Sequence, residues 1–321
     1  MATAPQGRVT LWGIEVFLAV ADEGTISGAA KRLGVTPSAI SQQVAVIEAA
    51  MGALLLDRSA RPMQLTQGGI MFRRHAQTIL NAEAEARADL AMADLGGLTT
   101  LRLGMIEDFD NEVTPQLLST LAQDLKNCRF LLETGASHRL LDQMDSRALD
   151  MVVVTDIGPE AQGDGWREVH PLMVEPFMAI YPKGQEGADL PLIQYTARHV
   201  MGRQIAAHLA RQNIKLAHRF ELDSYRAILA MVAAGQGWTI LTPLALHHVA
   251  RFHASVTAAP LPYAPHNIAP LSRRLSLIAR EGVLREVPAQ IAGHLRGLIG
   301  DRVIAPAHAQ WPWIKGALEL A

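Results

Sequence analysis

The 321-residue sequence predicts a multi-domain α+β protein, in which an all-α winged helix-turn-helix and a long linker helix precede a two-lobed α/β domain. Three observations predict this fold class. Capped apolar stripes with helical spacing occupy residues 14–51. An alanine-rich segment at 70–97 carries a single apolar seam. From residue 101 onwards, short β-type runs alternate with helical segments, as they do in α/β lobes.

The first two predicted helices follow from apolar spacing and from their ends. Ile14, Phe17 and Leu18 recur at helical spacing, which predicts a first helix with one buried face. A short second helix should follow, and we expect Ser27 to cap its N-terminus by accepting a backbone hydrogen bond. Gly34 ends this helix and opens the turn.

The third helix is predicted to begin at Thr36 and Pro37, which suit the N-cap and the first helical position. It should run to about residue 51, where Gly52 stops it. Its buried stripe is expected to consist of Ile40, Val44, Ile47 and Met51.

The opposite face of the third helix carries short polar side chains near its N-terminal end. In a helix-turn-helix this end enters the major groove of DNA, where a glutamine can pair with adenine. Arg58 and Arg61 flank a proline loop that predicts a two-strand wing facing phosphates or the minor groove. The alternative is a three-helix bundle whose polar face is merely solvated. The expected contacts to double-stranded DNA are Ser27, Thr36, Pro37, Ser38, Ser41, Gln42, Arg58 and Arg61.

Residues 70–97 predict one long linker helix that ends in a Gly96-Gly97 hinge. Its near-heptad seam consists of Phe72, Ala76, Ile79, Glu83, Ala86, Leu90 and Ala93. A helix with one apolar stripe favours pairing with the same helix of a second subunit, so we expect a homodimer. The alternative is that the stripe packs only on its own winged domain. A dimer would present two recognition helices to a pseudo-palindromic operator.

The remainder of the chain is predicted to form two α/β lobes. Strands are expected at 101–106, 130–133, 151–155, 177–181, 192–195, 219–222, 238–241 and 275–279, with helices at 115–125, 139–146, 202–212, 224–234, 243–249 and 287–298. These elements give a winged domain at 8–69, a linker at 70–97, a domain at 98–300 and a C-terminal extension at 301–321. Lobe I comprises 98–181 and 271–300, and lobe II comprises 182–270. Two crossings between the lobes leave a cleft.

Ligands of α/β lobes bind beyond the carboxyl ends of the strands. This rule selects Glu107, Asp108, Phe109, Asp110, Ser137, His138, Thr155, Asp156, Tyr195, Thr196, Asp223 and Ser224 as the effector-binding candidates. Their many carboxylates favour a small-molecule effector with an amine, another cationic group or several hydroxyls. Two alternatives stay open, because Asp223 can serve only as a helix cap and Asp110 can lie in solvent.

Composition excludes several other classes. The 31 acidic and 29 basic residues give no global basic field, so the case for DNA rests on local geometry. The single cysteine, Cys128, excludes an internal disulfide. We expect no catalytic centre, metal or cofactor, since no hydrolase elbow, phosphate loop or zinc motif is present. No signal peptide or bilayer-spanning run of ~20 apolar residues is visible, which favours a cytoplasmic protein without membrane contact.

With these elements in place, the chain resembles the LysR-type transcriptional regulators. Matching segments lie at 17–21, 24–26, 29–33, 38–41, 47–48, 56–58 and 65–69, with looser matches at 135–137, 149–153, 171–172 and 232–237. The resemblance implies an effector domain similar to type 2 periplasmic binding proteins, and a homodimer that assembles into a homotetramer. Gln42 departs from the family, which often has an arginine there, and this puts the usual base contacts in doubt. An alternative from another class is a DNA-anchored protein whose two-lobed domain retains enzymatic turnover.

The C-terminal extension also departs from the family's usual ending. It contains Trp311-Pro312-Trp313, which we interpret as a docking patch against the chain's own surface or a neighbouring subunit. No functional role is assigned to it.

Overall fold

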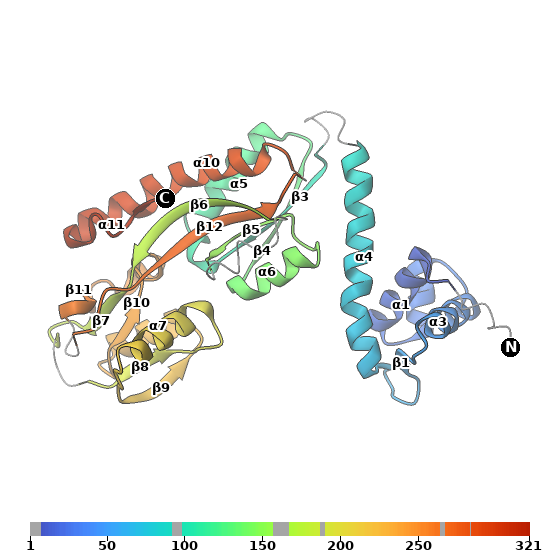
Figure 1. Cartoon of the computed structure of the whole chain (residues 1–321), viewed down its shortest axis with the longest axis horizontal. Helices are drawn as coiled ribbons and strands as arrows, with labels where there is room; N and C mark the ends of the chain where they lie inside the picture. The colour runs from blue at the N-terminus through green and yellow to red at the C-terminus, as the bar shows by residue number, and fades with distance from the viewer. Residues whose placement is uncertain (1–7, 92–97, 157–166, 187–189, 264–266, 283) are drawn as a thin grey trace. The chain divides into compact units, whose positions relative to one another are not determined.

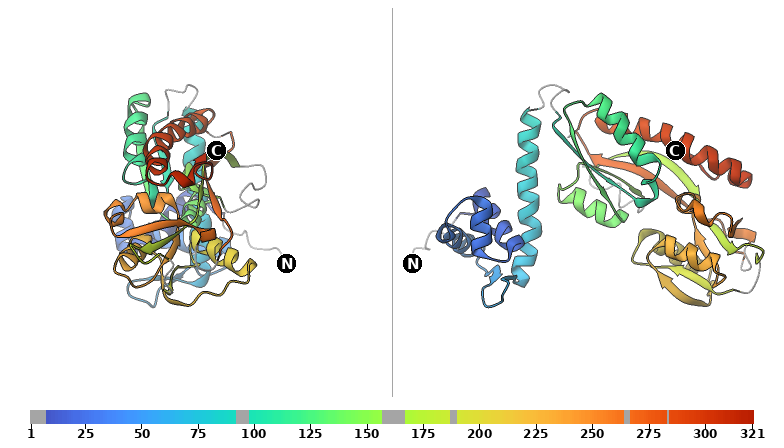
Figure 2. Two further views of the ribbon diagram at one scale, coloured as in Figure 1. Left: turned by 90° about the vertical axis from the view of Figure 1, so that its left-hand side faces the viewer. Right: turned by 180° about the vertical axis from the view of Figure 1, so that it is seen from behind.

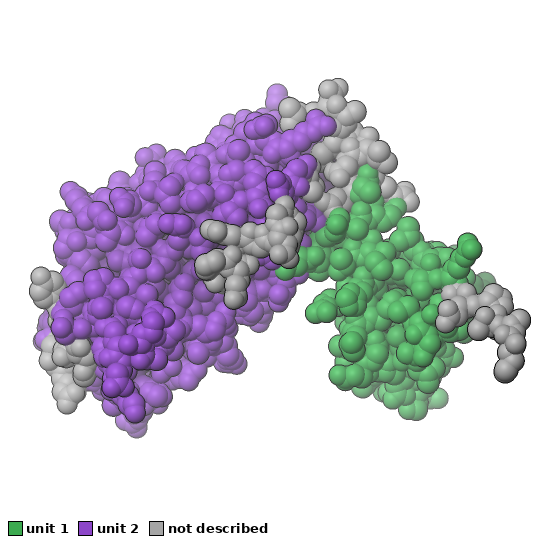
Figure 3. All heavy atoms as spheres, in the orientation of Figure 1, with its two compact units in different colours: residues 1–97, 145–148 green, residues 98–144, 149–321 purple. Residues whose placement is uncertain are grey.

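The structure is a computed structural model that describes residues 8–91, 98–156, 167–186, 190–263, 267–282 and 284–321. The chain forms two compact units (Figure 3). The first comprises Met1–Gly97 with Asp145–Ala148, and the second comprises Leu98–Met144 with Leu149–Ala321. Within the described residues, no helix is both long and apolar enough to cross a membrane.

Three short helices build the N-terminal domain: α1 (Leu11–Glu23), α2 (Ile26–Leu33) and α3 (Pro37–Met51). Threonines cap all three, because each precedes its helix in an extended conformation and its hydroxyl accepts a backbone N–H. The cap of α2 is therefore Thr25, whose Oγ1 lies 3.0 Å from the Gly28 nitrogen, and the expectation that Ser27 caps it is wrong. Ser27 lies inside the first turn, where its side chain is exposed.

The core of this domain contains the stripe predicted for α3, with one exception. Ile40, Val44 and Ile47 are buried against Phe17 and the other apolar residues of α1. Met51 was expected to be buried with them. It is 45% exposed, because the last turn of α3 lies outside this core. The predicted wing is present as the two-stranded pair β1 (Leu56–Asp57) and β2 (Gln64–Leu65).

Helix α4 (Gln67–Ala91) is the long linker helix, and it packs partly on its own domain. Phe72 and Ala76 are buried, and the Phe72 ring meets the Phe17 ring edge-on at 5.0 Å. The first part of the predicted seam therefore fills the winged domain's own core, as the alternative interpretation required. Ile79, farther along, is 41% exposed. The Leu90 side chain and Ala93 lie outside the described residues.

Lobe I is built on a six-stranded sheet in the order β13-β6-β12-β5-β3-β4. Its strands are β3 (Thr100–Met105), β4 (Arg129–Thr134), β5 (Met151–Thr155), β6 (Arg167–Pro176), β12 (Ser272–Arg280) and β13 (Glu319–Leu320). Strands β3, β4 and β5 are parallel, whereas β12 runs antiparallel to β5 and β6. Helices α5 (Val113–Asp124) and α10 (Val287–Ile299) cover one face, and α6 (Ser137–Asp145) covers the other (Figures 1 and 2).

Lobe II contains two smaller sheets. Strand β7 (Met178–Pro182) pairs antiparallel with β10 (Thr239–Leu241) and β11 (Val256–Pro260). Strands β8 (Leu192–Tyr195) and β9 (His218–Leu222) are parallel, and Leu192 bridges to Trp238 next to β10. The helices are α7 (Val200–Arg211), α8 (Tyr225–Ala233) and α9 (Pro243–His247).

The chain crosses between the lobes twice, once from β6 to β7 and once from β11 to β12. The first crossing falls at Phe177, so β7 belongs to lobe II and not to lobe I as the sequence suggested. Strand β6 was not predicted, because Pro171 and Pro176 lie within it and proline disfavours an interior strand. Strand β11 was likewise missed, since its Val-Thr-Ala-Ala-Pro sequence is weakly patterned.

The C-terminal extension closes one edge of the large sheet. Helix α11 (Ala305–Gln310) leads into a turn, after which β13 pairs antiparallel with β6. Trp311 is buried and its ring meets that of His253 edge-on at 5.9 Å, whereas Trp313 is exposed. The first tryptophan of the motif thus packs on the chain's own surface.

Candidate functional sites

The first candidate site is the solvent-facing side of α3. Ser38, Ser41 and Gln42 are all exposed there, opposite the buried stripe. Thr36 caps the helix by accepting from the Ala39 nitrogen at 3.3 Å, and its hydroxyl lies 3.0 Å from that of Ser38. Pro37 occupies the first helical position, where no N–H donor is required. The N-terminal end of α3 therefore presents short polar groups on a rigid, capped helix.

A buried carboxylate of α3 holds the wing in place. Oε1 of Glu48 accepts hydrogen bonds from the backbone nitrogens of Leu55 at 2.8 Å and Leu56 at 3.1 Å. Oε2 lies 2.9 Å from the Arg58 guanidinium. Both wing arginines are exposed, but among the described residues Arg61 makes no ion pair. Sequence reasoning identified the two arginines and missed the anchoring role of Glu48, whose buried position is what distinguishes it.

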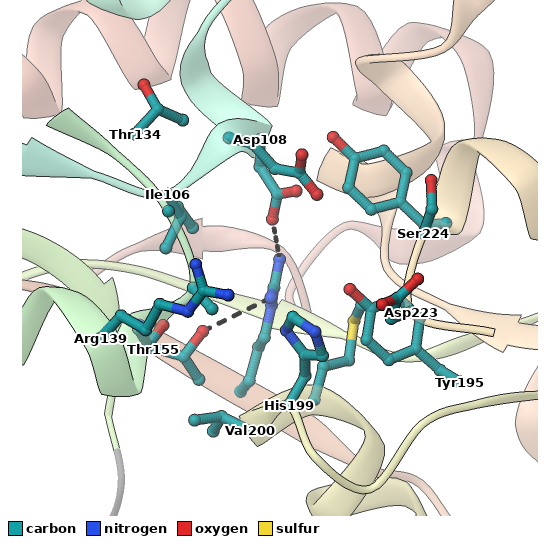
Figure 4. A pocket seen from close by; sticks show the side chains of 17 residues that line it. Ile106, Asp108, Thr134, Arg139, Thr155, Tyr195, His199, Val200, Asp223 and Ser224 are labelled. Atoms are coloured by element: carbon teal, nitrogen blue, oxygen red, sulfur yellow. Dashed lines mark hydrogen bonds and ion pairs between the residues drawn. The ribbon is translucent and has the colours of Figure 1, made fainter. Parts of the chain in front are cut away.

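The second candidate site is a cavity of about 290 Å³ between the two lobes (Figure 4). Strands of both lobes end at its wall, so residues after β3, β4, β5, β8 and β9 reach it. Seven of the predicted effector residues line it: Glu107, Asp108, Ser137, Thr155, Tyr195, Asp223 and Ser224. Ser224 caps α8 by accepting from the Ala227 nitrogen, which leaves the Asp223 carboxylate free of that role.

Five predicted effector residues lie outside the cavity wall: Phe109, Asp110, His138, Asp156 and Thr196. Phe109 is buried in lobe I, because the turn after β3 directs it into the core. Asp110 accepts a hydrogen bond from Thr134 at 3.1 Å, and Thr196 donates one to Glu221 at 2.7 Å. His138 meets His199 edge-on at 5.9 Å, and the Asp156 backbone continues the β5–β12 ladder.

The cavity also contains residues that sequence reasoning missed, above all Arg139, Arg273, His199 and Tyr225. Arg273 lies on β12, which is antiparallel to β5, so the start of β12 reaches the edge where β5 ends. A rule that considers only strand ends cannot find it. Arg139, His199 and Tyr225 each lie one to four residues past the predicted positions, in or next to a helix start. Arg139 and Arg273 add two cations to the carboxylates predicted at this edge.

Arg273 is the centre of a buried network between the lobes. Its Nη2 lies 2.7 Å from Oδ2 of Asp108 and its Nε lies 2.7 Å from Oε1 of Glu175. It also donates to the hydroxyls of Thr155 at 3.4 Å and Thr242 at 3.2 Å. Glu175 accepts a further hydrogen bond from the Leu244 nitrogen at 3.0 Å. The network therefore connects β5 and the turn after β3 with the start of α9.

Burial shifts the pKa values of other groups in the cavity. Desolvation, and then the neighbouring Asp108, raises the pKa of Glu107. Burial, followed by the charge of His138, lowers the pKa of His199. The described residues contain no cluster of three His, Cys, Asp or Glu side chains suited to a metal ion. The cavity is thus a mixed-charge polar site in which the side chains of Glu107 and Arg139 have no hydrogen-bonding partner among the described residues.

Two family models match the chain. Residues 11–70 match the bacterial regulatory helix-turn-helix protein, LysR family, and residues 96–291 match the LysR substrate binding domain. A probable hydrogen peroxide-inducible genes activator of Mycobacterium avium is 29% identical over 315 residues, covering 92% of this chain and 94% of that protein. The HTH-type transcriptional regulator DgdR of Burkholderia cepacia is 28% identical over 230 residues, covering 72% of this chain and 76% of that protein.

Solved structures share the fold. A full-length OxyR variant from Pseudomonas aeruginosa aligns with a TM-score of 0.64 at 20% identity, over 90% of this chain and 95% of that one. Full-length CbnR, a LysR family transcriptional regulator solved in complex with its target DNA, aligns with a TM-score of 0.60 at 19% identity, over 90% of this chain and 100% of that one. The relatives and neighbours are transcriptional regulators, which gives an enzymatic role no support.

Proposed function

Because the chain belongs to the LysR family of DNA-binding transcriptional regulators, we propose specific roles for its two candidate sites. Proteins of this family carry an effector-binding domain, oligomerise and are not enzymes. In this chain, the exposed face of α3 reads the operator and the interlobe cavity binds the effector that controls DNA binding.

The DNA-binding proposal is carried by one observation, the exposed N-terminal half of α3 beside an anchored wing. Ser38, Ser41 and Gln42 would contact base edges in the major groove. Thr36, Pro37 and Ser27 would lie near the phosphate backbone of the DNA. Arg58 and Arg61 would contact phosphates or the minor groove.

Selection of bound duplexes from a random pool tests this proposal. We expect pseudo-palindromic sites whose half-sites lie roughly one helical turn, or a multiple of it, apart. Recovery of unrelated sequences with no common half-site would reject sequence-specific reading by α3.

The effector proposal rests on the polar wall of the interlobe cavity. Glu107 and Asp223 supply carboxylates that Arg273 does not neutralise, which supports an effector with a cationic group or several hydroxyls. A thermal-shift screen of metabolites on the full chain tests it, because a ligand stabilises the state that it binds. Ala136→Phe should abolish the shift by filling the cavity, whereas Ala207→Phe on the exposed side of α7 should not. A shift that survives the cavity-filling change would place the ligand elsewhere.

Peroxide sensing through an internal disulfide is not proposed, although several relatives are named as peroxide-inducible gene activators. This sequence has one cysteine, so it cannot form such a bond within the chain. Burial, and then the Asp150 charge, raises the pKa of Cys128, which disfavours the reactive thiolate at neutral pH.

The oligomer is proposed to be a homodimer through α4, with further assembly into a tetramer. The exposure of Ile79, the seam residue beyond the part of α4 that packs on the winged domain, supports the α4 interface, because a second copy of α4 would cover it. Sedimentation of the full chain should give a dimer or tetramer, and a monomer at micromolar concentration would reject this. We also propose a cytoplasmic location, because the protein acts on chromosomal DNA.

A further inference from the structure

Two side chains of opposite charge on the cavity wall form no hydrogen bond or ion pair with the described residues. The Arg139 side chain, in the first turn of α6, makes no hydrogen bond or ion pair with any described residue. The Glu107 carboxylate, directly after β3, likewise accepts no hydrogen bond from a described residue. Arg139 and Glu107 both belong to lobe I and line the same cavity. Figure 4 labels Arg139 on the cavity wall. Burial raises the pKa of the Glu107 carboxyl even though the charge of Arg226 opposes this, so a cationic ligand group would offset the remaining desolvation cost. The Arg139 guanidinium is exposed and can meet an anionic ligand group.

The other arginine of the cavity is not available to a ligand. Arg273 already donates to Asp108, Glu175 and two threonine hydroxyls, and its side chain is only 4% exposed. Dashed lines in Figure 4 end on Asp108 and Thr155, which are two of the hydrogen-bond partners of the Arg273 guanidinium. An anionic ligand group would have to displace a buried carboxylate from it. Arg139 is therefore the cation that remains for a ligand, with the Ser137 hydroxyl on the same helix end.

The acidic side of the cavity has an equivalent asymmetry. Asp108 is neutralised by Arg273, and Asp223 lies 3.7 Å from the exposed Arg198. The Glu107 carboxylate forms no ion pair with a described residue, and the charge of Arg226 only partly offsets the effect of its burial. The carboxylate of Asp223, from the opposite lobe, faces the same space next to Tyr195 (Figure 4). A cationic group of a ligand would thus meet Glu107 from lobe I and Asp223 from lobe II.

We propose that the effector is a small zwitterion of the amino-acid type, whose carboxylate binds Arg139 and whose ammonium group binds Glu107 and Asp223. This inference rests on the proposed effector role of the cavity and narrows it to one chemical class. A cavity of about 290 Å³ lies at the lower end of ligand-pocket sizes, roughly 300–1,000 Å³. The ligand is therefore a small metabolite that touches both lobes, so its binding can favour one lobe arrangement over another.

Calorimetric titration of the full chain with the proteinogenic L-amino acids tests the proposal. Each amino acid that binds is then compared with two matched probes, its deaminated carboxylic acid and its decarboxylated amine. We expect both probes to bind at least ~10-fold more weakly than the amino acid, because each lacks one charge-assisted contact.

Variants assign each half of the ligand to its residue. Arg139→Gln should weaken the binding of the amino acid and of the carboxylic acid at least ~10-fold and leave the binding of the amine unchanged. Arg139→Lys should retain part of the affinity for the amino acid. Glu107→Gln should weaken the binding of the amino acid and of the amine and leave the binding of the carboxylic acid unchanged. Arg211→Gln, on the exposed surface of α7, is the matched control and should bind like the wild type. Thermal unfolding of each variant confirms that it is folded.

Several outcomes would overturn the proposal. The proposal is wrong if no amino acid in the panel binds, or if a deaminated acid or an amine binds as tightly as its parent amino acid. It is also wrong if both variants weaken the binding of all three compounds equally. If the metabolite screen instead finds another class that Ala136→Phe excludes, the zwitterion is wrong and the effector role of the cavity stands. If no metabolite stabilises the chain, both proposals fail.

Discussion

The Arg273 guanidinium lies 2.7 Å from the Asp108 carboxylate, and both side chains are buried in the wall of the interlobe cavity. Burial by itself would lower the pKa of Arg273, but Glu175 and Asp108 raise it, so the arginine stays charged. This pair joins the strand that returns from lobe II, β12, to the turn that follows the first strand of lobe I. The ion network is thus part of the connection between the lobes as well as of the cavity.

Replacing Arg273 with Met should destabilise the effector domain by ~3–5 kcal/mol, because two buried carboxylates lose their cation. Arg273→Lys should fall between this variant and the wild type, since an ammonium group cannot make all of the guanidinium contacts. Urea unfolding of the effector-domain transition measures both. The control is Arg274→Met on the exposed side of the same strand, expected within ~0.5 kcal/mol of the wild type. Equal stability of the two Met variants would contradict a role for the network.

Replacing Glu48 with Ala should destabilise the winged domain by ~1–3 kcal/mol, because the backbone N–H groups of Leu55 and Leu56 lose their acceptor. Glu48→Gln keeps an acceptor and should cost less. Thermal unfolding measures the stability, and DNA affinity should fall in the same order as the wing loses its anchor. Glu15→Ala on the exposed side of α1 is the control. An unchanged unfolding temperature for Glu48→Ala would show that the wing is held by other contacts.

Replacing Glu107 with Gln should stabilise the protein at neutral pH. Burial raises the pKa of Glu107 in the folded chain, so the folded state binds more protons here than the unfolded state. The contribution of this group to stability is therefore present at acid pH and is lost as the pH rises through the raised pKa. The gain should stay below about 1 kcal/mol, since solvent screens a partly exposed group.

Urea unfolding of the wild type and Glu107→Gln at several pH values between 4 and 8 checks this sign. The difference in unfolding free energy should grow with pH. A difference that shrinks as the pH rises would mean that a cation of the protein stabilises the Glu107 carboxylate, and the group would no longer be available for a ligand.

The two parts of the DNA-binding face should respond differently to substitution. Gln42→Ala should relax base preference at one operator position, by ~1–3 kcal/mol of discrimination. Arg61→Ala should weaken binding to specific and random duplexes alike. It should also reduce the slope of log affinity against log salt concentration by about one unit. Arg58→Ala should also weaken all sequences, with an added loss of stability because Arg58 pairs with Glu48. Fluorescence anisotropy over a salt series measures these effects, and equal loss on both duplexes for Gln42→Ala would remove it from the base-reading set.

Sequence patterns predicted local elements well where period, cap and turn agreed. Thr36, Pro37 and Gly52 mark the ends of α3 where it begins and stops. The cap of α2 was misplaced by two residues, because Thr25 and Ser27 have the same capping chemistry and only the backbone conformation selects between them. Strand β6 was missed because its prolines and charged residues do not fit a strand pattern, and its pairing with β12 stabilises it instead.

The candidate site was predictable only in part for a related reason. Strand ends selected Glu107, Ser137 and Asp223, since parallel strands bring their carboxyl ends to one edge. Arg273 could not be found in this way, because its position depends on the antiparallel pairing of β12 with β5, which joins residues more than a hundred positions apart. The charge balance of the cavity therefore required the tertiary structure.

We propose that a ligand in the interlobe cavity changes how this regulator occupies its operator. Footprinting on the selected operator, with and without the amino acid identified by titration, tests it most directly. We expect the wild-type footprint to change in length or protection pattern when the ligand is added, and the Arg139→Gln footprint to stay the same. A wild-type footprint that is identical with and without saturating ligand would contradict the account.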